Sequence, residues 1–440
     1  MSKQSIIRLP SELIDPWRQA LIRCAKLPRG INPKTHTTPS LMQAIVRGEA
    51  DEVARLWSIF TQEREELSRH LLANKRTAVA YLLGFHLANA ARAQMVLGRA
   101  HIRHPLARVL RDLDGKIIWH DLGCGTGAVA QVVMHNFVKA RVPLSRVALH
   151  LSDMSGTLLD TATELFTQAG WSENLHTHRY PLEKIVPERL APDGETALVG
   201  YSLGYVWNEL ARNKLARTTL LKMFEERSAQ EHPTLILVLE PAMQELAREA
   251  MQLRDTLTNM GYGVLYPCPQ SGPCPLLTRT RDWCYSEAKW EAPPEILRLD
   301  EMLAMDRRNL SGAGYLLASP ALMKKITGNA KKDLPPHGVK RLSQDAIVVG
   351  RPDRSTGRGF DYLVCQPSGL DKIPHAEGET ITLRGLPLER SGSLSPQIKK
   401  PDTPPKDRPA NPKTGKSAKD HSTKKKPMFN KSKKTSKSRV

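Results

Sequence analysis

Four of the six cysteines have a spacing that could hold an inorganic group. Three follow the pattern C-x5-C-x9-C and the fourth belongs to a later apolar segment; they are Cys268, Cys274, Cys284 and Cys365. An iron–sulfur cluster needs four thiolates on a chain able to wrap around it. Proline follows Cys268 and Cys274, and it stiffens a ligand loop because it fixes φ and removes an amide donor.

The residues alone leave other interpretations of these cysteines open. Structural zinc is the second choice, because zinc usually takes cysteines in C-x2-4-C pairs, and this sequence has none. A catalytic nucleophile is a distant third, since such a cysteine is expected at the end of the fourth strand of the sheet. Disulfides do not suit a reducing compartment. Cys24 and Cys124 are expected to be ordinary small residues.

A glycine-rich turn is the second candidate site. A short apolar run, 117–119, predicts a buried strand; it leads into Asp121 and then into three glycines, Gly123, Gly125 and Gly127, before a predicted helix from residue 128. Glycines there let a ligand approach the backbone amides. The order Asp-x-Gly-x-Gly-x-Gly differs from the dinucleotide fingerprint and resembles the first motif of class I methyltransferases that use S-adenosylmethionine (SAM). The alternative is a glycine turn of some other α/β protein.

That resemblance implies a role for each residue of the turn. The glycines would line the SAM pocket, and Asp121 would help to hold the amino-acid end of the cofactor. A second predicted strand, 147–151, runs toward Asp153, where a carboxylate would bind the ribose hydroxyls.

These sites must be positioned by an α/β domain. We expect helices over residues 1–112 and a doubly wound, mainly parallel sheet over 113–335, with strands at 117–119, 147–151, 175–180, 197–201 and 235–239 and a Cys-rich insertion at 262–290. A small β extension at 336–390, with strands near 346–350, 362–365 and 381–384, would bring Cys365 to the other cysteines. Residues 391–440 are expected to form a disordered Lys-rich tail.

The sequence identifies no catalytic residue. After the third predicted strand comes Pro181, where many SAM enzymes place an acid for the adenine amine. At the end of the fourth strand, Tyr201, Tyr205 and Trp207 could stack on a base, but we favour a core role for them. Catalytic residues therefore stay unknown.

Charge predicts a polyanionic partner. The chain of 440 residues has 65 Lys and Arg against 45 Asp and Glu, a formal net charge of +20. Of this, +12 belongs to residues 391–440, which have 15 Lys and Arg against 3 Asp, so the tail should bind nucleic acid without sequence preference. No apolar run approaches the ~20 residues that span a bilayer. We expect a cytoplasmic protein of bacterial type or, alternatively, a mitochondrial matrix protein.

Taken together, the glycine motif, Asp153, Glu240-Pro241 and the four cysteines resemble the small-ribosomal-subunit methyltransferase-like family of bacteria and mitochondria, the methyltransferase-like protein seventeen type. The resemblance covers about residues 70–390. It implies a class I SAM-methyltransferase (Rossmann-like) fold, a [4Fe–4S] cluster on Cys268, Cys274, Cys284 and Cys365, and action on the small ribosomal subunit and its rRNA. Methylation of rRNA, or subunit assembly without catalysis, would both fit this family.

Overall fold

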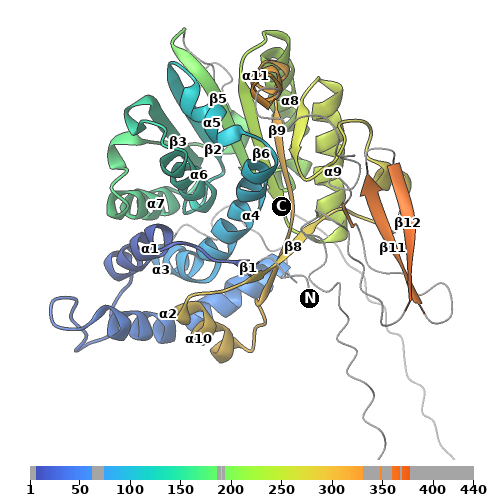
Figure 1. Cartoon of the computed structure of the whole chain (residues 1–440). Helices are drawn as coiled ribbons and strands as arrows, with labels where there is room; N and C mark the ends of the chain where they lie inside the picture. The colour runs from blue at the N-terminus through green and yellow to red at the C-terminus, as the bar shows by residue number, and fades with distance from the viewer. Residues whose placement is uncertain are drawn as a thin grey trace, which may run out of the picture. The chain divides into compact units, whose positions relative to one another are not determined.

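A sheet of nine strands runs through the body of the chain (Figure 1). The computed structural model describes residues 6–61, 74–185, 190, 194–330, 347–348, 359–366 and 369–376. The chain divides into two units, 1–394 and 395–440, and all described residues belong to the first. The strands of the large sheet are β1 (Ile6–Ile7), β2 (Lys116–Leu122), β3 (Val147–Asp153), β4 (Leu175–Arg179), β5 (Thr196–Gly204), β6 (Thr234–Glu240), β7 (Gly263–Tyr266), β8 (Ser286–Trp290) and β9 (Asn309–Ala318).

The strand order confirms the predicted doubly wound architecture. The sheet follows the path β1-β8-β9-β6-β5-β2-β3-β4, with β7 also paired to β9. Strands β4, β3, β2, β5 and β6 are parallel, whereas β9 is antiparallel to β6, β7 and β8. This mixed sheet is the fold of class I SAM methyltransferases. The order reverses at β2, between β3 and β5, so the carboxyl end of β2 is the switch point where such sheets bind ligands.

Helices cover both faces of the sheet. Figure 1 shows α6 and α7 on one side of the central strands and α8 and α9 on the other. The α-helices are α1 (Ser11–Cys24), α2 (Thr38–Thr61), α3 (Lys75–Tyr81), α4 (Leu87–Arg103), α5 (Leu106–Asp112), α6 (Ala128–Lys139), α7 (Gly156–Gln168), α8 (Lys214–Ala229), α9 (Gln244–Asn259), α10 (Pro294–Leu303) and α11 (Pro320–Ala330). A π-helical turn, η2 (Leu82–His86), joins α3 to α4. Single 3-10 turns are η3 (Leu144–Arg146), η4 (Ser172–Asn174), η5 (Leu182–Lys184), η7 (Glu209–Arg212) and η8 (Pro275–Thr278).

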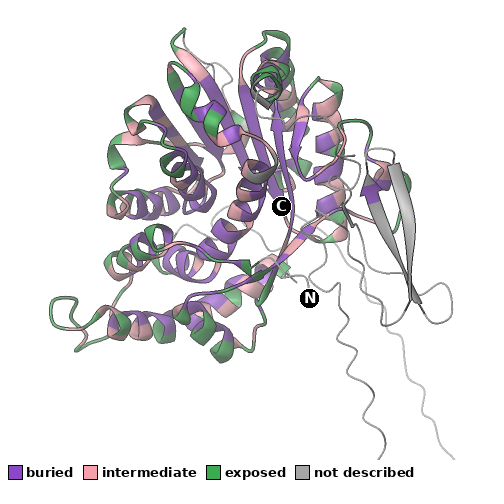
Figure 2. Cartoon of the chain, viewed as in Figure 1, coloured by how far each residue is buried: buried purple, intermediate pink, exposed green. Residues whose placement is uncertain are grey.

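Burial differs between the central and the edge strands of the sheet. All seven residues of β6, Thr-Leu-Ile-Leu-Val-Leu-Glu, are buried, as expected for a central parallel strand covered on both faces. The edge strand β4 instead has the polar sequence Leu-His-Thr-His-Arg and no buried residue. The buried residues follow the strands and the inner faces of the helices (Figure 2).

The N-terminal helices agree with the prediction of a helical leading segment, with one addition. Strand β1 pairs in parallel with β8, joining Ile6 to Lys289 and Ile7 to Trp290. The π turn η2 interrupts the helical path between α3 and α4. None of the described helices has both the length and the apolar character needed to cross a membrane.

A separate three-stranded antiparallel sheet contains Cys365. Its strands are β10 (Ile347–Val348), β11 (Gly359–Gln366) and β12 (Gly369–Ala376). The first two confirm predicted strands, and β12 was not predicted. The predicted strand at 381–384 and the predicted tail at 391–440 lie outside the described residues. The division into domains at residues 112, 335 and 390 stays a prediction.

Candidate functional site

The glycine loop lies at the switch point, between the end of β2 and the start of α6. All three glycines have positive φ, of 66° at Gly123, 56° at Gly125 and 78° at Gly127. A side chain at Gly123 would collide with Val206, and a Cβ at Gly127 would lie 2.9 Å from the ring of Phe166. Glycine is therefore required at both positions by the backbone and by the packing.

Asp121 is held inside the fold. Its carboxylate accepts a hydrogen bond from the hydroxyl of Ser202 on β5 and another, at 3.3 Å, from the amide of Ala130 on α6. Only 1% of its surface is exposed, and burial raises its pKa to about 7. The Ser202 hydroxyl also accepts from Trp119 Nε1 at 3.1 Å. Asp121 thus joins β2, β5 and α6, and its predicted contact with a cofactor stays a prediction.

Asp153, at the end of β3, shapes the glycine loop directly. One carboxylate oxygen accepts from the amide of Gly125 at 2.9 Å, and the other accepts from the amide of Ser155 at 2.8 Å. Burial raises its pKa, and these backbone hydrogen bonds oppose the increase. A carboxylate has about four acceptor positions, which is more than the backbone hydrogen bonds to Asp153 use. The residue that we predicted for ribose hydroxyls is therefore beside the loop and chemically able to accept from them.

A tyrosine that the sequence analysis missed covers the glycine loop. A Cβ at Gly125 would lie 3.4 Å from Cε1 of Tyr81, the last residue of α3. The Tyr81 ring stacks on Phe85 of the π turn, with ring centroids 5.3 Å apart. The π turn also directs His86 into the fold, where its Nδ1 lies 2.9 Å from the hydroxyl of Thr126 in the loop. The N-terminal helices therefore pack directly against the glycine loop.

The aromatic residues near the end of β5 are buried to different degrees. Tyr201 is fully buried and donates to the carbonyl of Leu190 at 2.9 Å; Trp207 is 4% exposed, with the Arg217 guanidinium 4.5 Å above its ring. The core interpretation is confirmed for these two. Tyr205 is half-buried and has a positive φ of 67°.

The neighbouring strand end has a buried acid. Glu240, at the end of β6, is fully buried and accepts from both the amide and the side chain of Asn208. Burial raises its pKa to about 8, against these two hydrogen bonds. Glu240 and its asparagine partner thus form a structural link between β6 and the segment after β5.

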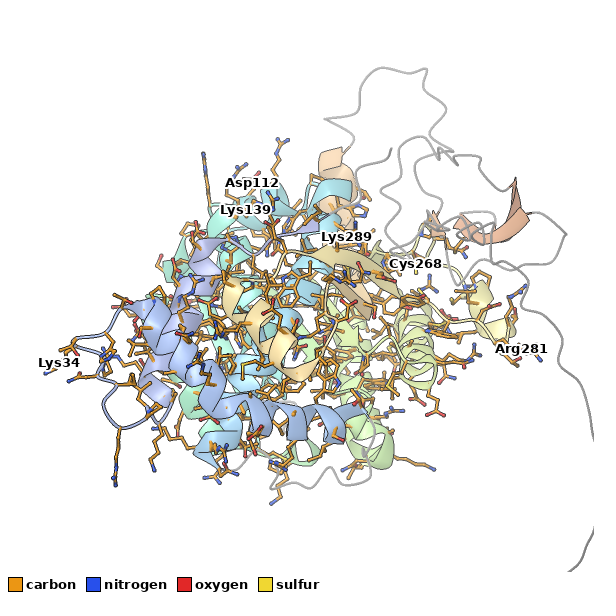
Figure 3. The ribbon with its side chains drawn as sticks, turned by 90° about the horizontal axis from the view of Figure 1, so that it is seen from below. Lys34, Asp112, Lys139, Cys268, Arg281 and Lys289 are labelled. Atoms are coloured by element: carbon orange, nitrogen blue, oxygen red, sulfur yellow. The ribbon has the colours of Figure 1, made fainter. Side chains whose placement is uncertain are left out.

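The four predicted cysteine ligands belong to one part of the core. Cys274, Cys284 and Cys365 are buried in one cluster, and Cys268 packs against it. Cys365 arrives on β11, and the neighbouring strand β12 contacts η8, which follows Cys274 directly. Burial is the main cause that raises the pKa of Cys274 to about 12, and the nearby thiols of Cys284 and Cys268 contribute to the increase. Residues that are distant in sequence thus belong to, or pack against, one hydrophobic cluster. Figure 3 labels Cys268 and Arg281 toward the same side of the picture.

Helix α9 holds the cysteine loop through its backbone. The backbone amide of Cys274 donates to both carboxylate oxygens of Asp255, at 3.1 Å to Oδ1 and 2.9 Å to Oδ2. Arg248 donates to four carbonyls of the loop, those of Leu276, Leu277, Arg279 and Asp282. Arg254 donates to the carbonyls of Gln270 and Gly272. Three charged side chains of one helix thus fix the path of the chain between the predicted ligands.

The donor set can be compared with the two inorganic groups considered. In the part of the chain that the structure describes, no three His, Cys, Asp or Glu side chains are arranged to hold a single metal ion. A zinc ion draws four thiolates to about 2.3 Å from one centre, whereas a four-iron cluster is a larger body that keeps its ligands apart. Both the cluster and the zinc ion therefore stay predictions.

One signal in the sequence could have identified the residues on α9. The buried face of this helix contains Ala247, Ala250, Met251 and Leu257 at helical spacing. Arg254 belongs to the same stripe, between Met251 and Leu257. A charged residue in an apolar stripe needs a partner. No comparable local signal marks Tyr81, because its contact with the glycine loop depends on packing between distant segments.

Comparisons with known proteins found solved structures that resemble part of the chain and one matching family. Precorrin-6y C5,15-methyltransferase from Geobacter metallireducens is 12% identical over 50% of this chain and 87% of that chain, with a TM-score of 0.27. A SAM-dependent methyltransferase from Aquifex aeolicus is 14% identical over 40% of this chain and 92% of that chain, with a TM-score of 0.25. TrmK of M. capricolum, in complex with S-adenosyl-homocysteine, is 9% identical over 49% of this chain and 68% of that chain, with a TM-score of 0.25. These scores carry no argument about function, and the fold assignment rests on the strand order. No curated protein matches the sequence. Residues 118–304 match the family described as mitochondrial small ribosomal subunit Rsm22.

Proposed function

We propose that the chain is a SAM-binding, iron–sulfur-containing methyltransferase-like protein that acts on the small ribosomal subunit. The observation that carries the proposal is the arrival of Cys365, from a separate sheet, in the same buried cluster as Cys274 and Cys284. The name of the matched family supports the ribosomal partner. The protein would be located in the bacterial cytoplasm or, alternatively, in the mitochondrial matrix.

SAM would bind over the glycine loop. Gly123, Gly125 and Gly127 would leave the backbone accessible, and Asp153 would accept from the ribose hydroxyls. Both carboxylate oxygens of Asp121 already accept hydrogen bonds from the protein. Asp121 would therefore help to hold the amino-acid end of SAM indirectly, by fixing the position of the glycine loop. Bound SAM would supply an electrophilic methyl group. Isothermal titration with SAM tests this part, and Asp153→Asn should weaken binding more than Asp160→Asn, which alters an exposed acid on α7.

The cluster would bind to Cys268, Cys274, Cys284 and Cys365. The buried positive charge of Arg254 beside Cys268 and Cys274 suits an anionic centre better than four neutral thiols. We expect a brown protein after anaerobic purification, with absorption near ~400 nm and bound iron and sulfide. Cys274→Ser should lose the iron, whereas the matched change Cys24→Ser, at a half-buried thiol on α1, should keep it. Stoichiometric zinc in the anaerobic protein would contradict the assignment.

Two roles on the ribosome remain to be separated, rRNA methylation and subunit assembly. Burial of Tyr201 and Trp207 favours assembly without catalysis, because neither ring is available to stack on a base. Mass spectrometry of rRNA from a deletion strain decides between the roles. A lost methyl group that returns with the wild-type gene, and not with Asp153→Asn, would establish the enzyme. An unchanged methylation profile with immature small subunits would establish the assembly factor.

A further inference from the structure

Arg254 of α9 is a buried cation whose hydrogen bonds are incomplete. Its side chain is 1% exposed, and it pairs with Asp255 at 2.6 Å. Its two terminal nitrogens also donate to the carbonyls of Gln270 and Gly272. Its Nε is buried and has no hydrogen-bond partner among the described residues. A buried N–H without an acceptor is rare in folded proteins and calls for an explanation.

The guanidinium lies beside the predicted ligands. The two carbonyls that it binds belong to residues between Cys268 and Cys274, and both thiols interact electrostatically with it. Its nearest acid, Asp255, is shared with the amide of Cys274. One shared carboxylate leaves this buried positive charge incompletely compensated, so the site favours an additional anion.

We propose that Arg254 is a positioning residue of the four-cysteine centre, where its Nε–H donates to a sulfur and its charge compensates the negative charge of the bound cluster. This inference rests on the function proposed above. Hydrogen bonds to the sulfurs and nearby charge are known determinants of cluster potentials. A positive charge stabilises the more negative, reduced state, so Arg254 raises the reduction potential and also slows loss of the cluster.

Arg248 provides a matched control on the same helix. It donates to four carbonyls between Leu276 and Asp282 and is half-exposed, and in this way it holds the loop. Its loss should loosen the loop. It should change the potential much less than loss of Arg254, because solvent screens the charge of a partly exposed side chain more than that of a buried one.

The test uses the full-length, anaerobically reconstituted protein and three variants, Arg254→Gln, Arg254→Lys and Arg248→Gln. Iron and sulfide content, the midpoint potential from an EPR-monitored titration and the rate of iron transfer to a chelator are measured for each. Arg254→Gln should lower the potential by about 59 mV, a tenfold change for a one-electron couple, and should lose iron roughly tenfold faster. Arg254→Lys keeps the charge without the Nε–H, so we expect at least a threefold faster loss of iron with a smaller change of potential. Arg248→Gln should accelerate iron loss with a much smaller change of potential than Arg254→Gln.

The outcomes separate this inference from the proposed function. A wild-type protein without iron refutes the proposed function, and the inference with it, before any variant is compared. Iron-loaded wild type with unchanged potential and iron loss in Arg254→Gln refutes the inference alone. If Arg254→Gln does not fold, as judged by circular dichroism, Arg254→Lys decides: wild-type rates and potential in that variant overturn the proposal.

Discussion

Gly127→Ala tests the close approach of the glycine loop to α7. Gly127 has φ +78°, and its Cβ would lie 2.9 Å from the ring of Phe166, a fully buried residue. A non-glycine residue in the left-handed region costs about 1–2 kcal/mol. Forcing an additional carbon against a packed ring costs about 1–3 kcal/mol more. We therefore expect the free energy of unfolding to fall by about 2–5 kcal/mol, a large share of the 5–15 kcal/mol typical of a folded protein.

Two other glycines separate the components of this loss in urea denaturation. Gly170 has φ +73° with nothing within 4 Å of its Cβ, so Gly170→Ala should lose only the backbone component of about 1–2 kcal/mol. Gly48, inside α2, has neither a positive φ nor a nearby atom, and Gly48→Ala should stabilise the protein by up to about 1 kcal/mol. The reasoning is refuted if Gly127→Ala loses no more stability than Gly170→Ala, because the difference between them measures the contact with Phe166.

Three further predictions concern the sheet and the tail. Ser202→Ala removes the donor to buried Asp121 and the acceptor of Trp119, so stability should fall by about 2–4 kcal/mol in urea; a loss below about 0.5 kcal/mol would contradict the hydrogen-bond assignment. Burial lowers the pKa of His120 to about 3, so below pH 6.5 the unfolded chain takes up a proton that the folded chain does not. Stability should therefore decline from pH 6.5 toward pH 3 more steeply in the wild type than in His120→Phe, by up to about 1.4 kcal/mol per pH unit; parallel curves would exclude this. Deleting residues 391–440 removes 15 Lys and Arg, and RNA affinity should fall with a shallower salt dependence, by roughly 0.7 in log–log slope for each lost phosphate contact; an unchanged slope in a filter-binding assay would mean that the tail does not contact RNA.

The parallel strands could be predicted from sequence because each is a short apolar run before a turn. The predicted strands at 117–119, 147–151 and 235–239 became β2, β3 and β6, each longer than predicted at one or both ends. Strand β9 was missed because it is rich in glycine. A side chain at Gly314 would collide with Val96 of α4, so the residues that let the helix approach also weaken the strand pattern.

The candidate site could be predicted as a set of residue types but not as an arrangement. Spacing identified the glycines, Asp153 and the cysteines. The contacts that position them come from Tyr81, Ser202 and Arg254, which are brought in by other elements. The π turn at 82–86 shows the same limit: His86 bonds to Thr126 and to Gln131, and no residue near it in sequence predicts these partners.

The pairing of β1 with β8 has a consequence for synthesis of the chain. Ile6 and Ile7 reach their partners Lys289 and Trp290 only after roughly 280 further residues have been translated, which takes about 15–60 s at 5–20 residues per second. During that interval the leading apolar residues and most of the parallel sheet emerge before the edge at β8 exists to receive them. Slowing translation before residue 290 would lengthen the time for which Ile6 and Ile7 lack their partner strand.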